Sequence, residues 1–489
     1  MSRPLHAAIL LAGVTSLLST PAGAGFTPDL ASLPAVPRVE VPPALVQKAL
    51  SQPVKERPYQ FAVPVSLSLS TAQGLWLMDG DTGSWRLRVH SEGALSLSLR
   101  LDRPTLPAGS ALWIYDPSAG LTHGPYDAAR IAPTGLWTPA VAGDELVVEI
   151  RVPTASADEL KLGPARAFHG FRTRKAGGDG ISAGSCNVDI TCPAAAAWTQ
   201  DGASVARIEI GGAYACTGQL LNNVRQDRRR LFLTADHCGV DGSTGPAASV
   251  IFYFGYEGAC NNGQSDPVPA PTFEGAQRLA RDVQSDFSLL LITDLSPLPD
   301  GLYFAGWDAT GQAPASGVAI HHPSGDEKKI SFYEEPAAPG TVNVGSGCPI
   351  PAWAVRWSAG TTETGSSGGG LWDASHRLVG VLSGGAASCS NPTGLDYFAR
   401  IDYAWTASSA TEGQLKAHLD PDGTCVAIVP GLDPATSPGP VLPTAANRVC
   451  AGPASYCSGR SGGGGSLGWL PVLLLFGASR LKPLLQKRV

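Results

Sequence analysis

The sequence predicts an all-β protein with more than one domain. Short segments that alternate apolar and polar residues recur along the chain, as expected for half-buried strands. Glycine (58 residues) and proline (41 residues) are abundant, which favours turn-rich β structure over long helices. The length of 489 residues suits about two to four domains of ordinary size.

The bulk composition is that of a soluble protein, with 43% hydrophobic and 16% charged residues. A formal net charge of −6 gives no indication of nucleic-acid binding. Ten cysteines are present, none of them before Cys186. An even number of scattered cysteines predicts disulfides in an oxidising compartment, and none shows the paired CxxC spacing that favours zinc.

The N-terminus indicates such a compartment. Arg3 supplies positive charge, the apolar run 7–18 follows, and Ala22-Gly-Ala offers small residues to signal peptidase. Residues 1–24 are therefore expected to be a secretory signal peptide that is cut after Ala24.

A small antiparallel β-sandwich is expected next, over about residues 59–152. Segments such as Val65–Ser70 and Leu95–Leu101 alternate as strands do, and this region contains neither a cysteine nor a cluster of catalytic residue types. The basic and then glycine-rich segment that begins at Arg172 is easily cut by proteases. We therefore expect a propeptide over 25–175, processed near Arg174 and Lys175. A plain interdomain linker is the alternative.

The catalytic domain is expected over residues 176–428. Many short apolar segments, from 205–210 to 398–401, and one late helical pattern at Glu412–Leu419 suit a pair of β-barrels. Residues 429–460 are expected to form a Pro/Ala-rich disordered spacer, with Cys450 and Cys457 closing a small loop. Residues 461–489 combine an apolar run with a basic end, which is typical of a membrane or sorting tail.

Peptide hydrolysis requires a nucleophile, a base, a group that orients the base, and donors for the oxyanion. The base is assigned to His237, because an apolar strand, Leu231–Thr234, runs into it and Cys238 follows it at once. A disulfide on Cys238 would fix the loop, and Cys216 is a plausible partner. Asp286 precedes the apolar segment 287–292, where a carboxylate can be shielded from water. Its competitors are Asp282 and Asp294.

The nucleophile is assigned to Ser367, within Gly365-Ser-Ser-Gly-Gly-Gly. Glycine permits the tight backbone that turns two amides toward one point, so the N–H groups of Gly365 and Ser367 are expected to form the oxyanion hole. Ser366 is the other candidate, and a flexible Gly/Ser linker is the structural alternative. The order His, Asp, Ser is chymotrypsin-like and argues against an α/β-hydrolase elbow, in which Ser comes first.

Several motifs in residues 184–405 together resemble those of the bacterial lysyl endopeptidase family of chymotrypsin-fold proteases. They are Gly184-Ser-Cys-Asn-Val-Asp-Ile-Thr-Cys-Pro, Ala215-Cys-Thr-Gly, Leu233-Thr-Ala-Asp-His-Cys-Gly, Ser285-Asp-Phe-Ser-Leu-Leu, Phe304-Ala-Gly-Trp-Asp, Ala319-Ile-His-His-Pro and Gly360-Thr-Thr-Glu-Thr-Gly-Ser-Ser-Gly. The resemblance implies the triad His237, Asp286 and Ser367. It also implies the disulfides Cys186–Cys389, Cys192–Cys260 and Cys216–Cys238. Cys348–Cys425 and Cys450–Cys457 are our own guesses for the remaining cysteines.

The resemblance also implies cleavage after a basic residue. Asp396 matches the acidic residue that the family places in the specificity pocket, and Ser383-Gly384-Gly385 matches the adjoining strand. Two departures weaken a strict preference for lysine, because Ser383 replaces the family's His and the region 345–351 does not match. Arginine is therefore a second candidate.

The segment Gly464-Gly-Ser-Leu-Gly-Trp-Leu resembles GlyGly-CTERM sorting signals. That resemblance implies a Gram-negative cell, type II secretion, a rhombosortase-type processing protease and display at the surface. A simple membrane anchor is the alternative.

Activation and metal binding complete the expectations. Ser366 stands where many chymotrypsin-like zymogens carry an Asp that receives a new N-terminus, so we expect removal of the propeptide to uncover the cleft instead. His321, His322, Asp326 and Glu327 form a metal-like cluster, but the family match makes them structural, and we expect no metal or cofactor.

The rival functions are a catalytically silent surface adhesin and an esterase.

Overall fold

The structure, a computed structural model, describes residues 26–54, 58–118, 121–131, 135–172, 183–261, 272–345 and 347–453. Within these ranges strands far outnumber helices, as expected for an all-β protein. The helices are short, and none of those described is long and apolar enough to cross a bilayer. They are α1 (Pro43–Leu50), α2 (Thr199–Gly202), α3 (Ile401–Trp405) and α4 (Lys416–Leu419).

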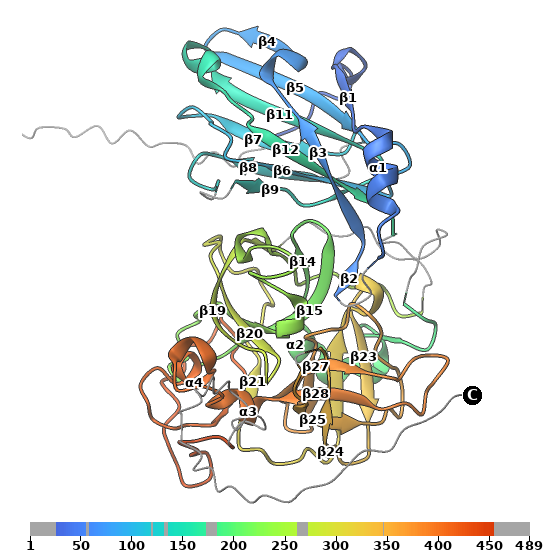
Figure 1. The fold of residues 1–489 in the computed structure, drawn as a ribbon. Coiled ribbons are helices and arrows are strands. Elements are labelled where there is room, and N and C mark those ends of the chain that lie inside the picture. Colours follow the sequence, from blue (N-terminus) through green and yellow to red (C-terminus); the bar gives the residue numbers. More distant parts are fainter. Residues whose placement is uncertain are drawn as a thin grey trace, which may run out of the picture. The chain divides into compact units, whose positions relative to one another are not determined.

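The N-terminal domain is a β-sandwich (Figure 1). One sheet contains β1 (Arg38–Glu40), β5 (Thr82–His90), β11 (Glu145–Pro153), β7 (Ala111–Tyr115) and β8 (Thr122–Tyr126) in this spatial order, with β4 (Leu75–Asp79) beside β5. The other contains β10 (Val141–Ala142), β6 (Ser96–Leu101), β12 (Pro164–Gly170) and β3 (Ala62–Ser68), with β9 (Leu136–Trp137) beside β6.

Alternation along the strands forms the core of this sandwich. In β3, Val65 and Leu67 are buried while Ser66 and Ser68 are exposed, because successive side chains point to opposite faces. The sandwich extends beyond the expected end at residue 152, since β12 lies between β6 and β3.

The cysteine-containing half forms two β-barrels. The first sheet has the order β18 (Phe273–Glu274), β17 (Ile251–Tyr253), β14 (Val205–Ile210), β15 (Tyr214–Leu221), β16 (Leu231–Thr234), β20 (Phe287–Ile292) and β19 (Ala276–Asp282). The second has the order β13 (Val188–Asp189), β23 (Lys329–Tyr333), β22 (Gly317–His321), β26 (Gly370–Asp373), β27 (Arg377–Gly385), β28 (Asp396–Arg400), β25 (Ile350–Val355) and β24 (Ala338–Val342), with β21 (Gly306–Asp308) and β29 (Ile428–Val429) beside it.

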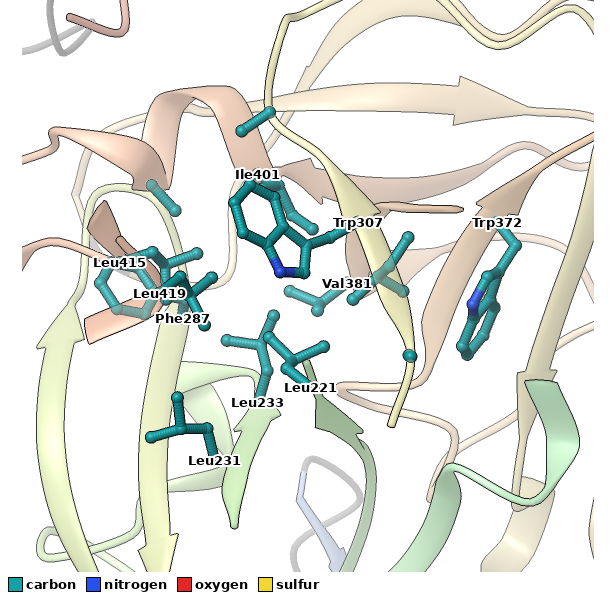
Figure 2. Close-up of a cluster of buried hydrophobic side chains, with 14 of the residues drawn as sticks. Leu221, Leu231, Leu233, Phe287, Trp307, Trp372, Val381, Ile401, Leu415 and Leu419 are labelled. Atoms are coloured by element: carbon teal, nitrogen blue, oxygen red, sulfur yellow. The ribbon is translucent and has the colours of Figure 1, made fainter. Parts of the chain in front are cut away.

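One hydrophobic cluster joins the two barrels. Leu221, Leu233 and Phe287 from the first barrel pack in the same cluster as Trp307 and Val381 from the second (Figure 2). Burial of one such side chain is worth about 1.5–3 kcal/mol, so the shared cluster fixes the barrels against each other. Segments that meet at this seam are therefore held in a defined geometry.

The expected spacer is part of the folded protease as far as the structure describes it. The Val441 N–H donates to the Val224 carbonyl at 2.8 Å, and the Trp405 Nε1–H donates to the Val449 carbonyl at 3.0 Å. Residues 430–453 therefore pack on the barrels, which the Pro/Ala-rich composition did not predict.

Candidate active site

His237 lies at the end of β16, within a 3-10 turn formed by Asp236–Cys238. The neighbouring Cys238 is bonded to Cys216 of β15, so a disulfide fixes the turn to the next strand. The His237 Nδ1–H donates to Asp286 Oδ2 at 2.9 Å, and the His237 backbone N–H donates to Asp286 Oδ1 at 2.9 Å. The imidazole therefore has one orientation and one tautomer.

Asp286 is buried immediately before β20 and adopts a left-handed backbone conformation, with φ of 45°. This conformation costs about 1–2 kcal/mol for a residue other than glycine, and here it aims the carboxylate at His237. The competing carboxylates lie elsewhere. Asp282 accepts bonds from Ser285, and Asp294 accepts bonds from Ser296.

Ser383 belongs with this carboxylate and does not line the pocket that we expected it to line. Its hydroxyl is fully buried and donates to Asp286 Oδ2 at 2.5 Å. The pairing of β27 with β28 explains the difference, because the register shifts between Leu382 and Gly384 and Ser383 is the residue left without a partner on β28.

Ser367 lies on a segment held between the two barrels. The Thr217 N–H of β15 donates to the Ser367 carbonyl at 2.8 Å, and the Gly368 N–H donates to the Leu382 carbonyl of β27 at 2.9 Å. Gly368 has a φ of +82°, and a Cβ there would lie 2.4 Å from the Thr217 carbonyl oxygen. Glycine at 368 is therefore required for the close approach of the segment to β15.

His237 Nε2, the atom that would face a nucleophile, is buried and makes no hydrogen bond within the described residues. The Ser367 hydroxyl is thus not bonded to it in this structure. The N–H groups of Gly365 and Ser367 likewise donate to no group in the part of the chain described. One acceptor and two donors of the candidate site are therefore left without partners among the described residues, whereas buried polar groups are normally paired.

Beneath this segment lies a hydrogen-bonded chain that our sequence reasoning missed. The Ser366 hydroxyl donates to His321 Nδ1 at 2.8 Å, and the His321 Nε2–H donates to the Ser331 hydroxyl at 3.1 Å. Ser331 in turn donates to the Thr361 carbonyl at 2.7 Å. Burial lowers the pKa of His321 to about 3, so the ring is neutral and its Nδ1 can accept the hydrogen bond from the Ser366 hydroxyl.

A cavity of about 350 Å³ opens beside Ser367 and contains Asp396 among its lining residues. Asp396 is buried, and its Oδ2 accepts the Trp357 Nε1–H and the Thr362 hydroxyl, each at 2.7 Å. Gly384 and Gly385 form part of the wall, as the sequence predicts.

Glu363 is a second carboxylate of this cavity, and we did not assign it from the sequence. Its Oε1 accepts the Gly184 N–H at 2.9 Å, and its Oε2 accepts the Ser324 hydroxyl at 3.0 Å. The sequence did contain a signal for Glu363, because this residue lies in the motif Gly360–Gly368 that also contains Ser367. The cavity thus presents negative charge to an entering side chain.

The three disulfides implied by the resemblance are present, namely Cys186–Cys389, Cys192–Cys260 and Cys216–Cys238. Our guesses for the others were wrong, because Cys425 is bonded to Cys450. This bond removes one partner from each guessed pair, Cys348–Cys425 and Cys450–Cys457. Cys348 is itself disulfide-bonded.

The remaining site expectations have mixed outcomes. The His321, His322, Asp326 and Glu327 cluster does not converge, and the described residues contain no group of three or more such side chains that could hold a metal ion. His322 Nδ1–H donates to the Asp326 carbonyl at 2.9 Å. The expected processing positions Ala24, Arg174 and Lys175, and the tail 461–489, lie outside the described residues.

Comparison with known proteins identifies two domains of one family. The N-terminal domain of lysyl endopeptidase matches residues 46–163, and the lysyl endopeptidase C-terminal domain matches residues 181–399. A lysyl endopeptidase of Pseudomonas aeruginosa is 36% identical over 285 residues, which are 54% of this chain and 60% of that protein.

Solved structures give weaker likenesses. The active form of the protease Rv3671c from M. tuberculosis has 19% identity and a TM-score of 0.31, and the match covers 48% of this chain and 89% of that one. An HtrA-type protease solved with a tripeptide has 16% identity and a TM-score of 0.30, covering 43% and 60% of the two chains. The two domain models match in the order expected of one protein, so the chain resembles lysyl endopeptidases in both of its described halves, and it spans 60% of the length of the curated relative.

Proposed function

We propose that this protein is a serine endopeptidase that cleaves peptide bonds after lysine, with arginine as a second accepted residue. The observation that carries the proposal is the buried Asp286–His237 pair, whose Nε2 is unpaired and whose neighbour Cys238 has its Sγ 3.7 Å from the Ser367 carbonyl oxygen. Ser367 Oγ would attack the scissile carbonyl carbon while His237 Nε2 takes the hydroxyl proton. Asp286 would hold the imidazole and stabilise its charged form.

The later steps use the same groups. The N–H groups of Gly365 and Ser367 would donate to the oxyanion, and the His237 proton would pass to the leaving amine. Water would then release the acyl group from Ser367, with His237 again as the base. Asp396 and Glu363 would attract the basic side chain that precedes the scissile bond, because two carboxylates line that cavity.

We further propose that the protein is made as a secreted precursor. Residues 1–24 would be removed by signal peptidase, and residues 25–175 would act as a propeptide cut near Arg174 and Lys175 ahead of the catalytic domain 176–428. The tail 461–489 would direct type II secretion and processing by a rhombosortase-type protease at a Gram-negative cell surface. The substrates of the mature endopeptidase would be proteins and peptides that contain basic residues.

The test is hydrolysis of peptides that differ only in Lys, Arg or Ala before the scissile bond. Ser367→Ala should lower kcat/KM by about 10⁴-fold or more, because the nucleophile is lost. Asp396→Asn should lower kcat/KM for the lysine peptide by about 10- to 100-fold, since a hydrogen bond to a charged group is worth roughly 1.5–3 kcal/mol. The exposed Asp300→Asn is the matched control.

Each negative result points elsewhere. Absence of hydrolysis by the processed wild-type protein would favour the silent adhesin. Cleavage of the alanine peptide alone would keep the triad and remove Asp396 from the specificity pocket.

A further inference from the structure

One edge of β15 connects the N-terminal domain to the nucleophile. Strand β16 pairs with this edge only over Gln219–Leu221. The Thr217 N–H, two residues earlier, donates to the Ser367 carbonyl at 2.8 Å. At the start of the strand the partner is β2 (Tyr59–Gln60), which runs antiparallel to Tyr214 and Ala215. The strand from the N-terminal domain and the nucleophile segment are therefore neighbours along one strand.

The strand from the N-terminal domain is firmly docked. The Phe61 N–H and the Ala62 N–H both donate to the Ala213 carbonyl, at 2.9 and 3.3 Å. An apolar cluster surrounds these bonds and buries all of its members. They are Tyr59, Phe61, Ala62, Trp137, Phe168, Ala213 and Ala215.

Two walls flank Ser367 and differ in what they can receive. On one side is β27, whose Gly384 and Gly385 form the cavity that contains Asp396. That cavity takes the side chain before the scissile bond, so the acyl half of a substrate lies on the β27 side. On the other side of Ser367 is β15, so the part of the substrate that follows the scissile bond would lie along β15. The edge at Ala213–Ala215 is main chain that an extended peptide can pair with there.

Tyr59 also reaches the support of the candidate oxyanion hole. A Cβ added at Gly325 would lie 3.5 Å from the Tyr59 ring and 3.5 Å from the Ala215 Cβ. A Cβ added at Gly365 would lie 2.7 Å from the Gly325 backbone nitrogen. Gly325 thus lies close both to the docked strand and to the loop of Gly365.

We propose that the β15 edge at Ala213–Ala215 binds the leaving-group half of extended substrates, and that Tyr59–Ala62 of the N-terminal domain occupies this edge as a competitor. This inference rests on the proposed function. The N-terminal domain then inhibits by blocking one half of the cleft. Among the described residues, those that line the cavity of Asp396 and a second cavity of about 290 Å³ beside His237 all belong to the protease, so the described part of the N-terminal domain does not fill either cavity.

Our expectation was that removal of the propeptide uncovers the cleft, and the proposal specifies which half of the cleft the N-terminal domain occupies. A short substrate that ends in lysine and a chromogenic anilide has no peptide beyond the scissile bond, so it does not need the β15 edge. A peptide with five residues after the same lysine does need it. The uncut chain is therefore expected to discriminate between the two substrates.

The experiment compares these two substrates on the secreted full chain, in an uncut form carrying Arg174→Gln and Lys175→Gln and in the processed wild type. The uncut form should hydrolyse the anilide within about threefold of the processed form, and the long peptide at least about tenfold more slowly. Adding Tyr59→Ala and Phe61→Ala to the uncut form should restore cleavage of the long peptide. Leu77→Ala with Met78→Ala, on an exposed strand of the same domain, should restore nothing.

The other outcomes overturn the proposal in distinct ways. Equal loss on both substrates would mean that the whole cleft is covered, and no loss on either would mean that the edge is not used. If the Tyr59/Phe61 variant cannot fold, it will lose the anilide activity as well, and the comparison of the uncut Arg174→Gln, Lys175→Gln form with the processed wild type still decides the matter. Failure of the processed wild type to cleave the anilide would instead count against the proposed function.

Discussion

At the scale of single residues, the Asp286 carboxylate shows how the site is ordered. It accepts three hydrogen bonds, from the His237 ring, the His237 backbone and the Ser383 hydroxyl, and it is almost fully buried. Buried carboxylates are stable as anions only when such donors are present. Ser383 therefore supports the anion that would stabilise a protonated His237.

Ser383→Ala should lower kcat by about 10- to 100-fold and leave KM nearly unchanged. It removes a hydrogen bond to a charged group, which is worth roughly 1.5–3 kcal/mol, without altering the lining of the cavity. Steady-state kinetics on a lysine anilide would measure this, with the exposed Ser375→Ala as the control. A raised KM with normal kcat would instead return Ser383 to the specificity pocket.

Local sequence context located most of the candidate site, and topology supplied the rest. His237 and Asp286 adjoin apolar strands and Ser367 lies in a glycine frame, so each has a signal in its own neighbourhood. The partners of Ser366 have no such signal, because His321 lies 45 residues away and meets it only after the second barrel forms. The position of Ser383 also depends on pairing, because the register of β27 with β28 shifts at this residue and a shift of this kind is not visible in the sequence.

At the scale of elements, alternation predicted strands well and composition predicted the C-terminal segment badly. β3 (Ala62–Ser68) overlaps the alternating segment Val65–Ser70, because its period-two burial is visible in the sequence. Residues 430–453 are rich in proline and alanine, yet the Ala427 N–H donates to the Asn447 carbonyl and the Val449 N–H donates to the Cys425 carbonyl. The amino-acid composition of a segment does not predict backbone hydrogen bonds of this kind.

The Cys425–Cys450 disulfide closes this C-terminal segment over a separation of 25 residues. Replacing both cysteines with serine should lower the free energy of unfolding by about 3 kcal/mol, because the unfolded chain gains the entropy of an open loop. Urea denaturation of the processed protein would measure the loss, with the neighbouring exposed Ala451→Ser as the control. An unchanged midpoint would mean that the packed backbone, and not the disulfide, holds this segment.

At the scale of the whole molecule, the N-terminal domain and the protease share a titratable contact. The Tyr126 hydroxyl of β8 donates to Glu274 Oε1 of β18 at 2.9 Å. The pKa of Glu274 is raised to about 7, mainly by burial and also by the charge of Asp294, while Arg130 and the Tyr126 hydrogen bond act in the opposite direction. Tyr126 itself is buried, and its own pKa lies well above the ordinary value. The docked state therefore favours a protonated Glu274.

Docking of the N-terminal domain should weaken as pH rises. A carboxyl whose pKa is raised in the docked state contributes its full stabilisation below its ordinary pKa of 4.5 and loses it as pH passes through about 7. Gel filtration of the cut chain, blocked at Ser367 after cutting, should show both fragments together at about pH 5.5 and more separation at about pH 8.5. Glu274→Gln stays neutral at both values, so it should remove this dependence. If the two fragments separated to the same extent in the wild type and in this variant at every pH, groups other than Glu274 would control the release of the N-terminal domain.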